Sequence, residues 1–429
     1  MRQFHIRHPA EVKFLRALDF RESLALRAGS RLARLHHFRR LGQRCEVEDN
    51  RPRLGRTIYT SSVIPPLKNL NWHSFLARPP LPPPPLEALD ALGQQPALIT
   101  GAGGSIGSVL ALRLATLGTP MLLLLESSES HLYHLDRQWT ESGAPGPMTA
   151  VLGNVADRAL LDEVFSTHEP CIVFHTAAFK HVPLMEAHPL AAMANNIFGT
   201  ETLVRAAAAH GARVVLLSTD KAVEPTSVMG ATKRVGEQIV LDSGGTVLRL
   251  SNVLASRDSV AEVFAQQIAL GGPITVTNPA ARRYFLTLDE AVNLLLTAAA
   301  HPRASALLAP VLPTAHRITD LAQFMACELA PNREIAIKFT GLRPGDKETE
   351  LLWTEGERTI PVHPSALVSI HSSVLPKERL NRSLAGLHAA LEARDLAGAL
   401  IQLRSLVPEY SPSPALVARA QQCGVEASL

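Results

Sequence analysis

Glycines at regular spacing mark one segment of the chain that could bind a charged ligand. Residues 101–107 read Gly-Ala-Gly-Gly-Ser-Ile-Gly and lie between an apolar run, residues 97–100, and a stretch of helical periodicity that begins at Ser105. Backbone without side chains allows a tight turn, a close approach of a pyrophosphate to the amides, and close packing of the helix on the strand. The spacing therefore predicts a dinucleotide-binding loop, with contacts from Gly101, Gly103, Gly104, Ser105, Ile106 and Gly107.

Two polar residues follow the next predicted strands, where they could contact the adenosine half of a dinucleotide. Glu126 ends the second strand, and its carboxylate could accept hydrogen bonds from ribose hydroxyls and repel a 2′-phosphate. This favours NAD over NADP, although both stay open, and the alternative for Glu126 is an exposed position at the start of a helix. Asn154, beside Val155, follows the third strand, and its side-chain carbonyl could accept a hydrogen bond from the adenine amino group.

Strands and helices alternate from residue 97 onward. The predicted strands are 97–100, 121–125, 148–152, 171–175 and 214–218, and the predicted helices are 105–117, 156–168, 191–210 and 230–243. Alternation at this spacing indicates right-handed βαβ units and a parallel sheet. We therefore expect an α/β fold: a Rossmann-type doubly wound sheet over residues 95–250, and a small C-terminal substrate-binding subdomain within residues 251–429, interleaved with the sheet.

The charge of the chain is unevenly placed. Residues 1–95 carry 16 Lys and Arg against 8 Asp and Glu, whereas the remainder carries 26 against 31. Apolar residues between 9 and 42 recur at helical spacing among arginines, which predicts a basic helical N-terminal arm over residues 1–75. A proline-rich linker, residues 76–94, follows it. The arm could pack on its own body or on another subunit of a homo-oligomer, contact an anionic membrane surface, or stay poorly ordered.

The overall composition is that of a globular protein with ample material for a core: 46% of the 429 residues are hydrophobic and 19% are charged. The net charge of +3 gives no support for a nucleic-acid partner. Cys45, Cys171, Cys327 and Cys423 show no paired spacing, so neither a metal site nor a disulfide framework is predicted. The longest apolar run is too short to cross a bilayer, and a cytoplasmic location is expected.

Four further motifs carry a family resemblance. They are Phe-Lys-His-Val-Pro at 179–183, Ser-Thr-Asp-Lys-Ala-Val at 218–223, Met-Gly-Ala-Thr-Lys at 229–233, and Gly-Leu-Arg-Pro-Gly-Asp-Lys at 341–347. From about residue 75 to about residue 355 the chain resembles the extended short-chain dehydrogenase/reductases. Within them it is similar to the UDP-N-acetylglucosamine 4,6-dehydratases of polysaccharide biosynthesis.

The resemblance implies a lyase reaction without net redox change. Sugar C4 is oxidised transiently by bound NAD(P), a base removes the C5 proton, an acid helps the C6 hydroxyl leave as water, and the hydride returns to C6. Thr219, Asp220 and Lys221 match the family's catalytic triplet, with Asp220 as the acid and Lys221 as the base. Because the two groups are neighbours, their titrations are coupled.

The resemblance also assigns two residues of the next helix. Lys233 matches the lysine of the superfamily's Tyr-x-x-x-Lys pair and should hold the nicotinamide ribose. Met229 stands where most members carry the tyrosine that removes the C4 hydroxyl proton, and a thioether cannot do so. A subset of the resembled family carries Met at this position. The C4 base stays unassigned, and Thr219 could relay the proton to Asp220, Lys221 or water.

Several other positions are expected contacts of cofactor or substrate. Ala177, Ala178 and Lys180 are expected at the cofactor, and Lys180 and His181 at the substrate. Asn252, Arg257, Arg283 and Arg343 match segments that bind the UDP-sugar, where an arginine fork could clamp a phosphate. Ser251, Ala255 and Asp258 stand where the family usually has glycines, which leaves substrate choice open.

Three functions follow from these expectations. The leading one is a 4,6-dehydratase that makes a UDP-4-keto-6-deoxy-hexosamine for surface glycans. A C5-inverting dehydratase or a nucleotide-sugar 4-epimerase is the second. The third is an inactive, cofactor-binding scaffold protein.

Overall fold

A computed structural model describes residues 67–302, 304–362 and 366–422. The chain divides into two units, residues 1–60 and residues 61–429, and every described residue belongs to the second. The basic helices predicted between residues 9 and 42 lie outside the described residues.

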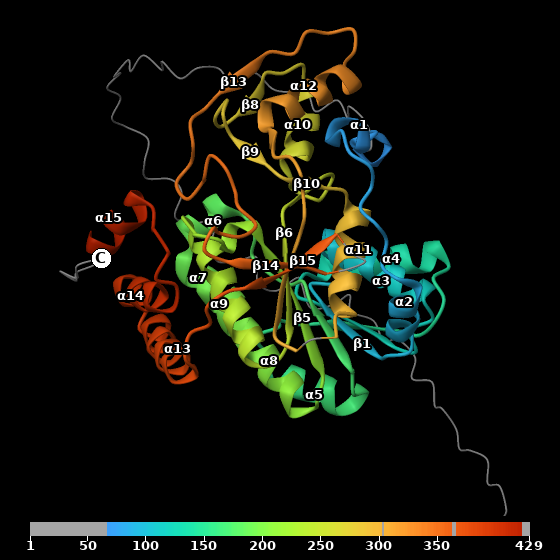
Figure 1. Ribbon diagram of the computed structural model, residues 1–429, viewed down its shortest axis with the longest axis vertical. Helices are drawn as coiled ribbons and strands as arrows, with labels where there is room; N and C mark the ends of the chain where they lie inside the picture. The colour runs from blue at the N-terminus through green and yellow to red at the C-terminus, as the bar shows by residue number, and fades with distance from the viewer. Residues whose placement is uncertain (1–66, 303, 363–365, 423–429) are drawn as a thin grey trace, which may run out of the picture. The chain divides into compact units, whose positions relative to one another are not determined.

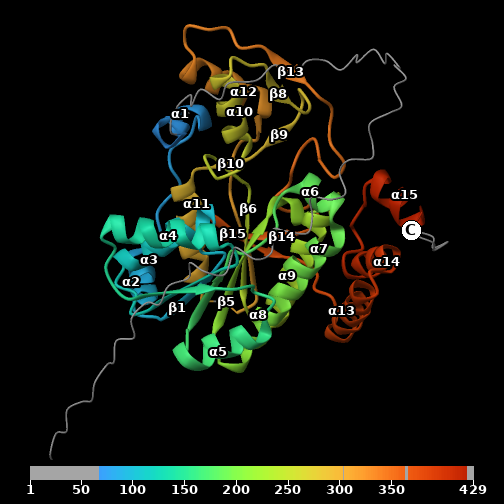
Figure 2. The same ribbon diagram turned by 180° about the vertical axis from the view of Figure 1, so that it is seen from behind.

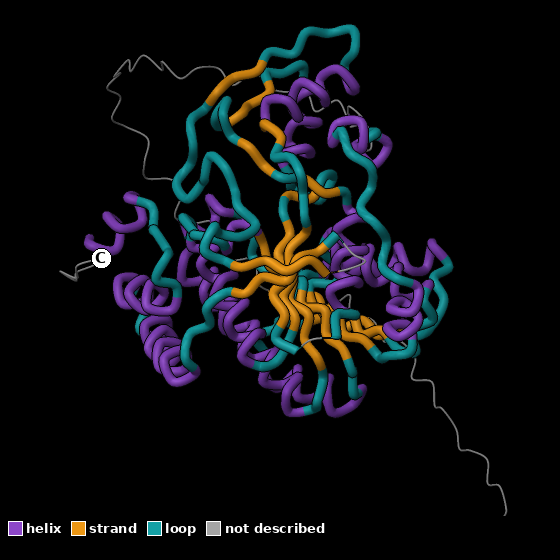
Figure 3. The backbone as a smooth tube through the Cα atoms, viewed as in Figure 1, coloured by secondary structure: helices purple, strands orange, loops and turns teal. Residues whose placement is uncertain are grey.

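A sheet of nine strands forms the centre of the described unit (Figure 3). Its central strands are apolar on both faces, and every residue of β1 and β2 is buried. Such strands need helices on both sides, which is the usual arrangement of a parallel sheet. The strands are β1 (Ala97–Thr100), β2 (Leu122–Glu126), β3 (Met148–Leu152), β4 (Ile172–His175), β5 (Arg213–Thr219), β6 (Thr246–Leu250), β11 (Ala306–Pro310), β14 (Arg358–Val362) and β15 (Leu367–His371).

The strand order is β14-β15-β11-β6-β5-β4-β1-β2-β3. The strands from β3 to β11 run parallel, and β15 and β14 close one edge in antiparallel pairing. The order reverses between β1 and β4, and in doubly wound sheets ligands bind beyond the carboxyl ends of strands at this switch point. The sequence prediction of an α/β fold with a Rossmann-type sheet is confirmed.

Helices cover both faces of the sheet (Figures 1 and 2). One face carries α3, α4 and α11, with α2 against α11, and the opposite face carries α5, α8 and α9. Their bounds are α2 (Leu86–Gly93), α3 (Ser105–Thr116), α4 (Glu129–Ser142), α5 (Arg158–His168), α8 (Gly199–Ala209), α9 (Val228–Asp242) and α11 (Leu288–Ala299). Among the described residues, no helix has the length and apolar content needed to span a membrane.

Helix α9 is enclosed on all sides. Residues 228–241 are all buried, because α14 packs against α9 on the side away from the sheet. The Gln238 amide donates to the Leu406 carbonyl at 3.1 Å, which ties the two helices together. The C-terminal helices are α13 (Lys377–Glu392), α14 (Leu396–Leu406) and α15 (Pro414–Gln422).

A smaller subdomain with its own core lies beyond the carboxyl ends of the strands (Figure 1). Phe75, within the predicted arm, packs against Phe285 and Phe324 in this core, with ring centroids 5.8 and 5.4 Å away. The subdomain consists of η1 (Leu67–Asn69), α1 (Trp72–Leu76), β7 (Asn252–Val253), α10 (Val260–Ala269), β8 (Ile274–Val276), β9 (Arg282–Arg283), β10 (Phe285–Leu286), β12 (His316–Arg317), α12 (Ile318–Leu329) and β13 (Ile337–Phe339). The predicted linker contains α2, whose Leu89 and Leu92 are buried in the main core.

The helix predicted over residues 191–210 is interrupted. The chain forms α6 (Val182–Ala187), α7 (Pro189–Met193), a π-helical turn η2 (Ala194–Phe198), and then α8. The Asn196 side chain accepts a hydrogen bond from Phe179 N at 2.8 Å and donates to Phe179 O at 3.1 Å. Wider turns of this kind often occur at functional sites. Here the turn fixes the loop that follows β4.

Candidate active site

The glycine-rich loop joins β1 to α3 at the switch point. Gly101 has φ +67°, and Gly104 N donates to Gly101 O at 2.9 Å, which closes the turn. Gly104 is also the N-cap of α3, and no side chain caps that helix start. Uncapped amides at a helix N-terminus carry partial positive charge. The loop therefore fits a pyrophosphate.

Replacing Gly101 with alanine should remove the bound dinucleotide. A Cβ at this position would lie 2.7 Å from Ala177 Cα, and the left-handed backbone adds strain. The dinucleotide released from the purified, denatured protein measures the loss. Gly118→Ala is the matched control, because φ is +81° there but nothing lies within 4 Å of the added Cβ. If Gly101→Ala retains as much dinucleotide as Gly118→Ala, the loop is not the binding element.

The two residues expected at the adenosine half lie near this loop. Glu126 is buried, and its carboxylate accepts hydrogen bonds from Gly103 N at 3.1 Å and Ser128 N at 3.0 Å. The Glu126 carboxylate therefore stabilises the glycine-rich loop through its hydrogen bond with Gly103. The side-chain carbonyl of Asn154 accepts a hydrogen bond from Ala156 N at 2.8 Å. One of the two lone pairs of this oxygen is therefore used within its own turn.

Asp220, which is buried, and Lys221, which is partly exposed, form an ion pair at the carboxyl end of β5, in the short helix η3 (Asp220–Ala222). Lys221 Nζ lies 2.9 Å from Asp220 Oδ1 and donates to Asn252 Oδ1 at 3.2 Å. Thr219 Oγ1 donates to the same Asp220 oxygen at 3.0 Å. Asp220 is fully buried, and its Oδ2 has no hydrogen-bond partner among the described residues. That oxygen is a buried hydrogen-bond acceptor without a partner among the described residues.

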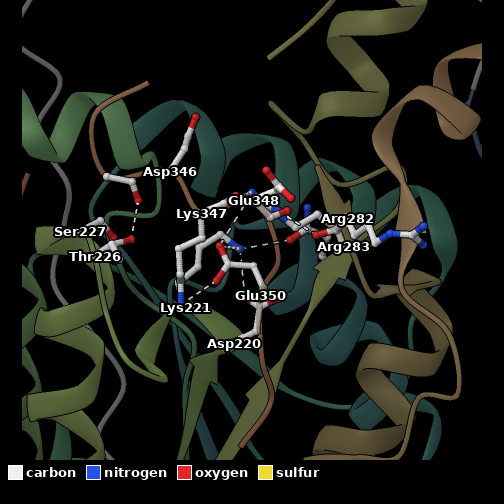
Figure 4. Close-up of polar contacts among 12 residues, drawn as sticks. Asp220, Lys221, Thr226, Ser227, Arg282, Arg283, Asp346, Lys347, Glu348 and Glu350 are labelled. Atoms are coloured by element: carbon white, nitrogen blue, oxygen red, sulfur yellow. Dashed lines mark hydrogen bonds and ion pairs between the residues drawn. The ribbon is translucent and has the colours of Figure 1, made fainter. Parts of the chain in front are cut away.

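Glu350 completes this cluster and was missed by the sequence analysis. It is buried, and its Oε1 lies 3.8 Å from Lys221 Nζ (Figure 4). Arg283 Nη2 lies 3.9 Å from the same oxygen, and Lys347 Nζ lies 3.0 Å from Oε2. Its place three residues after the Gly-Leu-Arg-Pro-Gly-Asp-Lys motif is the only signal in the sequence that could have indicated it.

The charges around Lys221 determine its protonation. Burial lowers the pKa of Lys221, but the carboxylates of Asp220 and then Glu350 outweigh burial, and the net pKa lies above its ordinary value. The amine is therefore protonated at rest, and Asp220 is the nearest group that could receive its proton.

Helix α9 brings Met229 and Lys233 beneath the switch point. Both side chains are buried, and burial lowers the pKa of Lys233 to about 8, although Glu237 opposes the shift. His175, at the end of β4, is hydrogen-bonded to Thr100 Oγ1 at 2.7 Å and Thr200 Oγ1 at 2.9 Å. Burial, with the charge of Lys233, lowers the pKa of His175 to about 3, so the imidazole is neutral in ordinary buffers.

The expected substrate contacts are divided between three places. Asn252 and Arg283 join the cluster around Lys221. Arg257 instead contacts the glycine-rich loop. Its guanidinium contacts the Gly103 carbonyl, and its backbone N–H donates to Ser105 Oγ at 2.9 Å. Arg343 is exposed and pairs with Asp346 at 2.8 Å, away from the cluster.

The loop that carries Arg257 also contacts the segment after β4. Lys180 Nζ donates to the Arg257 carbonyl at 2.5 Å, and His181 Nε2 lies 3.9 Å from Asp258 Oδ2. Ala255 and Asp258 have φ +58° and +55°, the left-handed region that favours glycine. The two positions thus keep a backbone suited to glycine while carrying side chains.

Two cavities are prominent. One of about 380 Å³ borders Gly103, Ser105, His131 and Arg257, next to the glycine-rich loop. A larger one of about 540 Å³ lies between α5, α8 and α13, and none of the expected site residues lines it. We place the site at the first cavity and the Lys221 cluster, because the chemically competent residues lie there.

The chain is similar to proteins of polysaccharide biosynthesis. The profile of a family described as "Polysaccharide biosynthesis protein" matches residues 97–371. The probable polysaccharide biosynthesis protein EpsC of Bacillus subtilis is 36% identical over 303 residues, 68% of this chain and 50% of that protein. The chain spans about half the length of the first relatives it matches. A UDP-glucose 4-epimerase of Rickettsia rickettsii is 33% identical over 61% of this chain and 78% of the epimerase.

Solved structures share the fold. Pen from Bacillus thuringiensis superposes with a TM-score of 0.60 at 27% identity, covering 66% of this chain and 88% of Pen. DesIV, a dTDP-glucose 4,6-dehydratase of Streptomyces venezuelae with NAD bound, gives a TM-score of 0.53 at 19% identity, covering 59% of this chain and 87% of DesIV. The second likeness concerns the fold alone.

Proposed function

The chain belongs to the polysaccharide biosynthesis protein family, and we propose that it is a nucleotide-sugar 4,6-dehydratase acting on UDP-N-acetylglucosamine. The observation that carries this proposal is the Asp220–Lys221 pair, 2.9 Å apart at the carboxyl end of β5. An elimination of water needs one base and one acid at the same time, and this pair contains both.

A single proton transfer prepares the pair. At rest it is an ammonium and a carboxylate, and movement of one proton from Lys221 Nζ to Asp220 gives a neutral amine and a carboxylic acid. The amine takes the C5 proton, and the acid gives its proton to the departing C6 hydroxyl, which leaves as water. Lys221 is then protonated and Asp220 is ionised again. The pair has then returned to its resting state. When the hydride is added to C6, Lys221 gives the proton back to C5, and water reprotonates the amine.

The residues around the glycine-rich loop fit a nicotinamide dinucleotide. The uncapped start of α3 would hold the pyrophosphate, Glu126 the adenosine ribose, and Lys233 the nicotinamide ribose. When bound, the cofactor supplies reversible hydride removal at sugar C4, which acidifies the C5 proton. The buried carboxylate of Glu126 favours NAD.

The C4 hydroxyl needs a different proton acceptor from the usual tyrosine. Met229 has no acidic or basic group, whereas Thr219 Oγ1 is hydrogen-bonded to Asp220. We assign Thr219 as the relay that passes the C4 hydroxyl proton to water, because Asp220 accepts the proton of Lys221.

Incubation of the purified protein with UDP-N-acetylglucosamine tests the proposal. We expect a product that has lost one water by mass spectrometry, with a C4 ketone and a C6 methyl group by NMR. The configuration at C5 in the same spectrum separates a retaining from an inverting dehydratase. An unchanged sugar under conditions in which the protein holds its dinucleotide would contradict the proposal and favour the scaffold alternative.

A 4-epimerase is the second candidate, because the Rickettsia relative bears that name. Epimerisation needs removal and return of hydride at C4 but no C5 base. The acid–base pair weighs against it, as does the absence of a tyrosine at position 229. A product of unchanged mass with inverted C4 would establish this alternative.

A further inference from the structure

We propose that Glu350 is a positioning residue that controls, through its negative charge, the protonation of the Asp220–Lys221 pair. This inference rests on the proposed function, since it concerns the pair that would carry out the elimination. Glu350 comes from the segment after the Gly-Leu-Arg-Pro-Gly-Asp-Lys motif and lies beside Lys221, which also pairs with Asp220 (Figure 4).

Glu350 interacts with its neighbours mainly through charge and less through hydrogen bonds. Its carboxylate faces three cations: Lys221, Arg283 and Lys347. Its Oε2 nevertheless makes no hydrogen bond among the described residues, although Lys347 Nζ lies 3.0 Å away. Burial of a carboxylate costs desolvation free energy, which neighbouring cations must offset.

Backbone carbonyls hold two of the three cations, and Lys221 is held by the side chains of Asp220 and Asn252. Lys347 Nζ donates to the Val223 carbonyl at 2.8 Å. The Arg283 guanidinium donates to the carbonyls of Lys347 at 2.7 Å and Glu348 at 2.9 Å. The cluster is therefore rigid, and Glu350 faces Lys221 at a fixed separation.

This geometry has a direct consequence for the pair. A negative charge 3.8 Å from Lys221 Nζ stabilises the ammonium against the neutral amine. Glu350 therefore keeps Lys221 protonated before the substrate binds. Arg283 and Lys347 offset part of this charge, so the three residues together determine how readily the proton moves to Asp220.

The pH dependence of kcat/KM in Glu350→Gln tests this role. Without the negative charge of Glu350, the Asp220–Lys221 pair should lose its shared proton at a lower pH. The basic limb of the kcat/KM profile should therefore move down by about one pH unit or more. Glu348→Gln is the matched control, because Glu348 is an exposed carboxylate two residues away, and its profile should be that of the wild type. A lower kcat with an unmoved basic limb would show a merely structural role and overturn the inference.

A second measurement does not depend on turnover. A small acylating reagent reacts only with neutral amines, and peptide mass spectrometry reports acylation at Lys221 as a function of pH. The midpoint should fall by a similar amount in Glu350→Gln. It should rise in Lys347→Gln, where the carboxylate loses a cation that offsets its charge. Unchanged midpoints in both variants would refute the inference. If one variant fails to fold, the direction of the shift in the other still tests it.

The two failures can be told apart. If the wild type makes no dehydrated sugar but the Lys221 midpoints shift as expected, the proposed function is wrong and the charge coupling stands. If the wild type makes the product and neither the limb nor the midpoint moves, the coupling is wrong and the function stands.

Discussion

Lys221→Ala is expected to lower kcat by about 10²–10⁴-fold, the usual contribution of a positioned general base. The substitution removes the amine that lies 2.9 Å from Asp220 Oδ1 and leaves Asp220 and Glu350 without their shared cation. The glycine-rich loop and Lys233 are unchanged, so the purified variant should retain its dinucleotide. Product formation by mass spectrometry and dinucleotide content after denaturation measure the two effects separately.

Lys221→Arg is the control that separates charge from basicity. A guanidinium keeps the positive charge between the two carboxylates, but it does not deprotonate in proteins. We expect a variant with a wild-type melting temperature and no dehydrated product. If either variant turned over within tenfold of the wild type, Lys221 would not be the base.

Arg249→Met is expected to lower the free energy of unfolding by about 3–5 kcal/mol, the usual effect of breaking a buried ion pair from one side. Arg249 is 1% exposed and makes two hydrogen bonds of 3.0 Å to Glu237, on α9. It also donates to the Leu352 carbonyl at 3.1 Å. The substitution leaves Glu237 buried with Arg234 as its remaining cation.

Denaturation in urea measures this change, and Arg137→Met is its control. The Arg137–Glu141 pair is 2.6 Å long, but its side chains are 63% and 61% exposed, and such surface pairs contribute about 0–1 kcal/mol. Equal unfolding midpoints for the two variants would contradict the importance assigned to the buried pair. Because Glu237 lies on the helix that carries Lys233, Arg249→Met should also weaken dinucleotide retention.

The parts of the fold that the sequence predicts are those with a local signal. Buried parallel strands such as β1 and β2 are short apolar runs, and the glycine spacing at 101–107 requires a specific backbone. The ends of the strands then follow within about one residue of their predicted positions. The polar residues after β4 and β5 lie at the same edge of the sheet because parallel strands end there.

The parts that the sequence does not predict depend on contacts between distant residues. Glu350 is one of many carboxylates in the chain, and only the return of its segment to β5 gives it a role. Arg257 lies on a loop that folds back onto the glycine-rich loop, a contact between segments about 150 residues apart. The π-helical turn at Asn196 depends on hydrogen bonds to Phe179, which no helical periodicity reveals.

The complete enclosure of α9 has a consequence for how the protein is made. The helix leaves the ribosome well before α14, whose Leu406 carbonyl receives the Gln238 amide. Until then a growing chain exposes an apolar flank of its central helix, together with a sheet edge that still lacks β15 and β14. Such surfaces promote aggregation of nascent chains. We therefore expect rapid completion of the last helices to limit aggregation during synthesis.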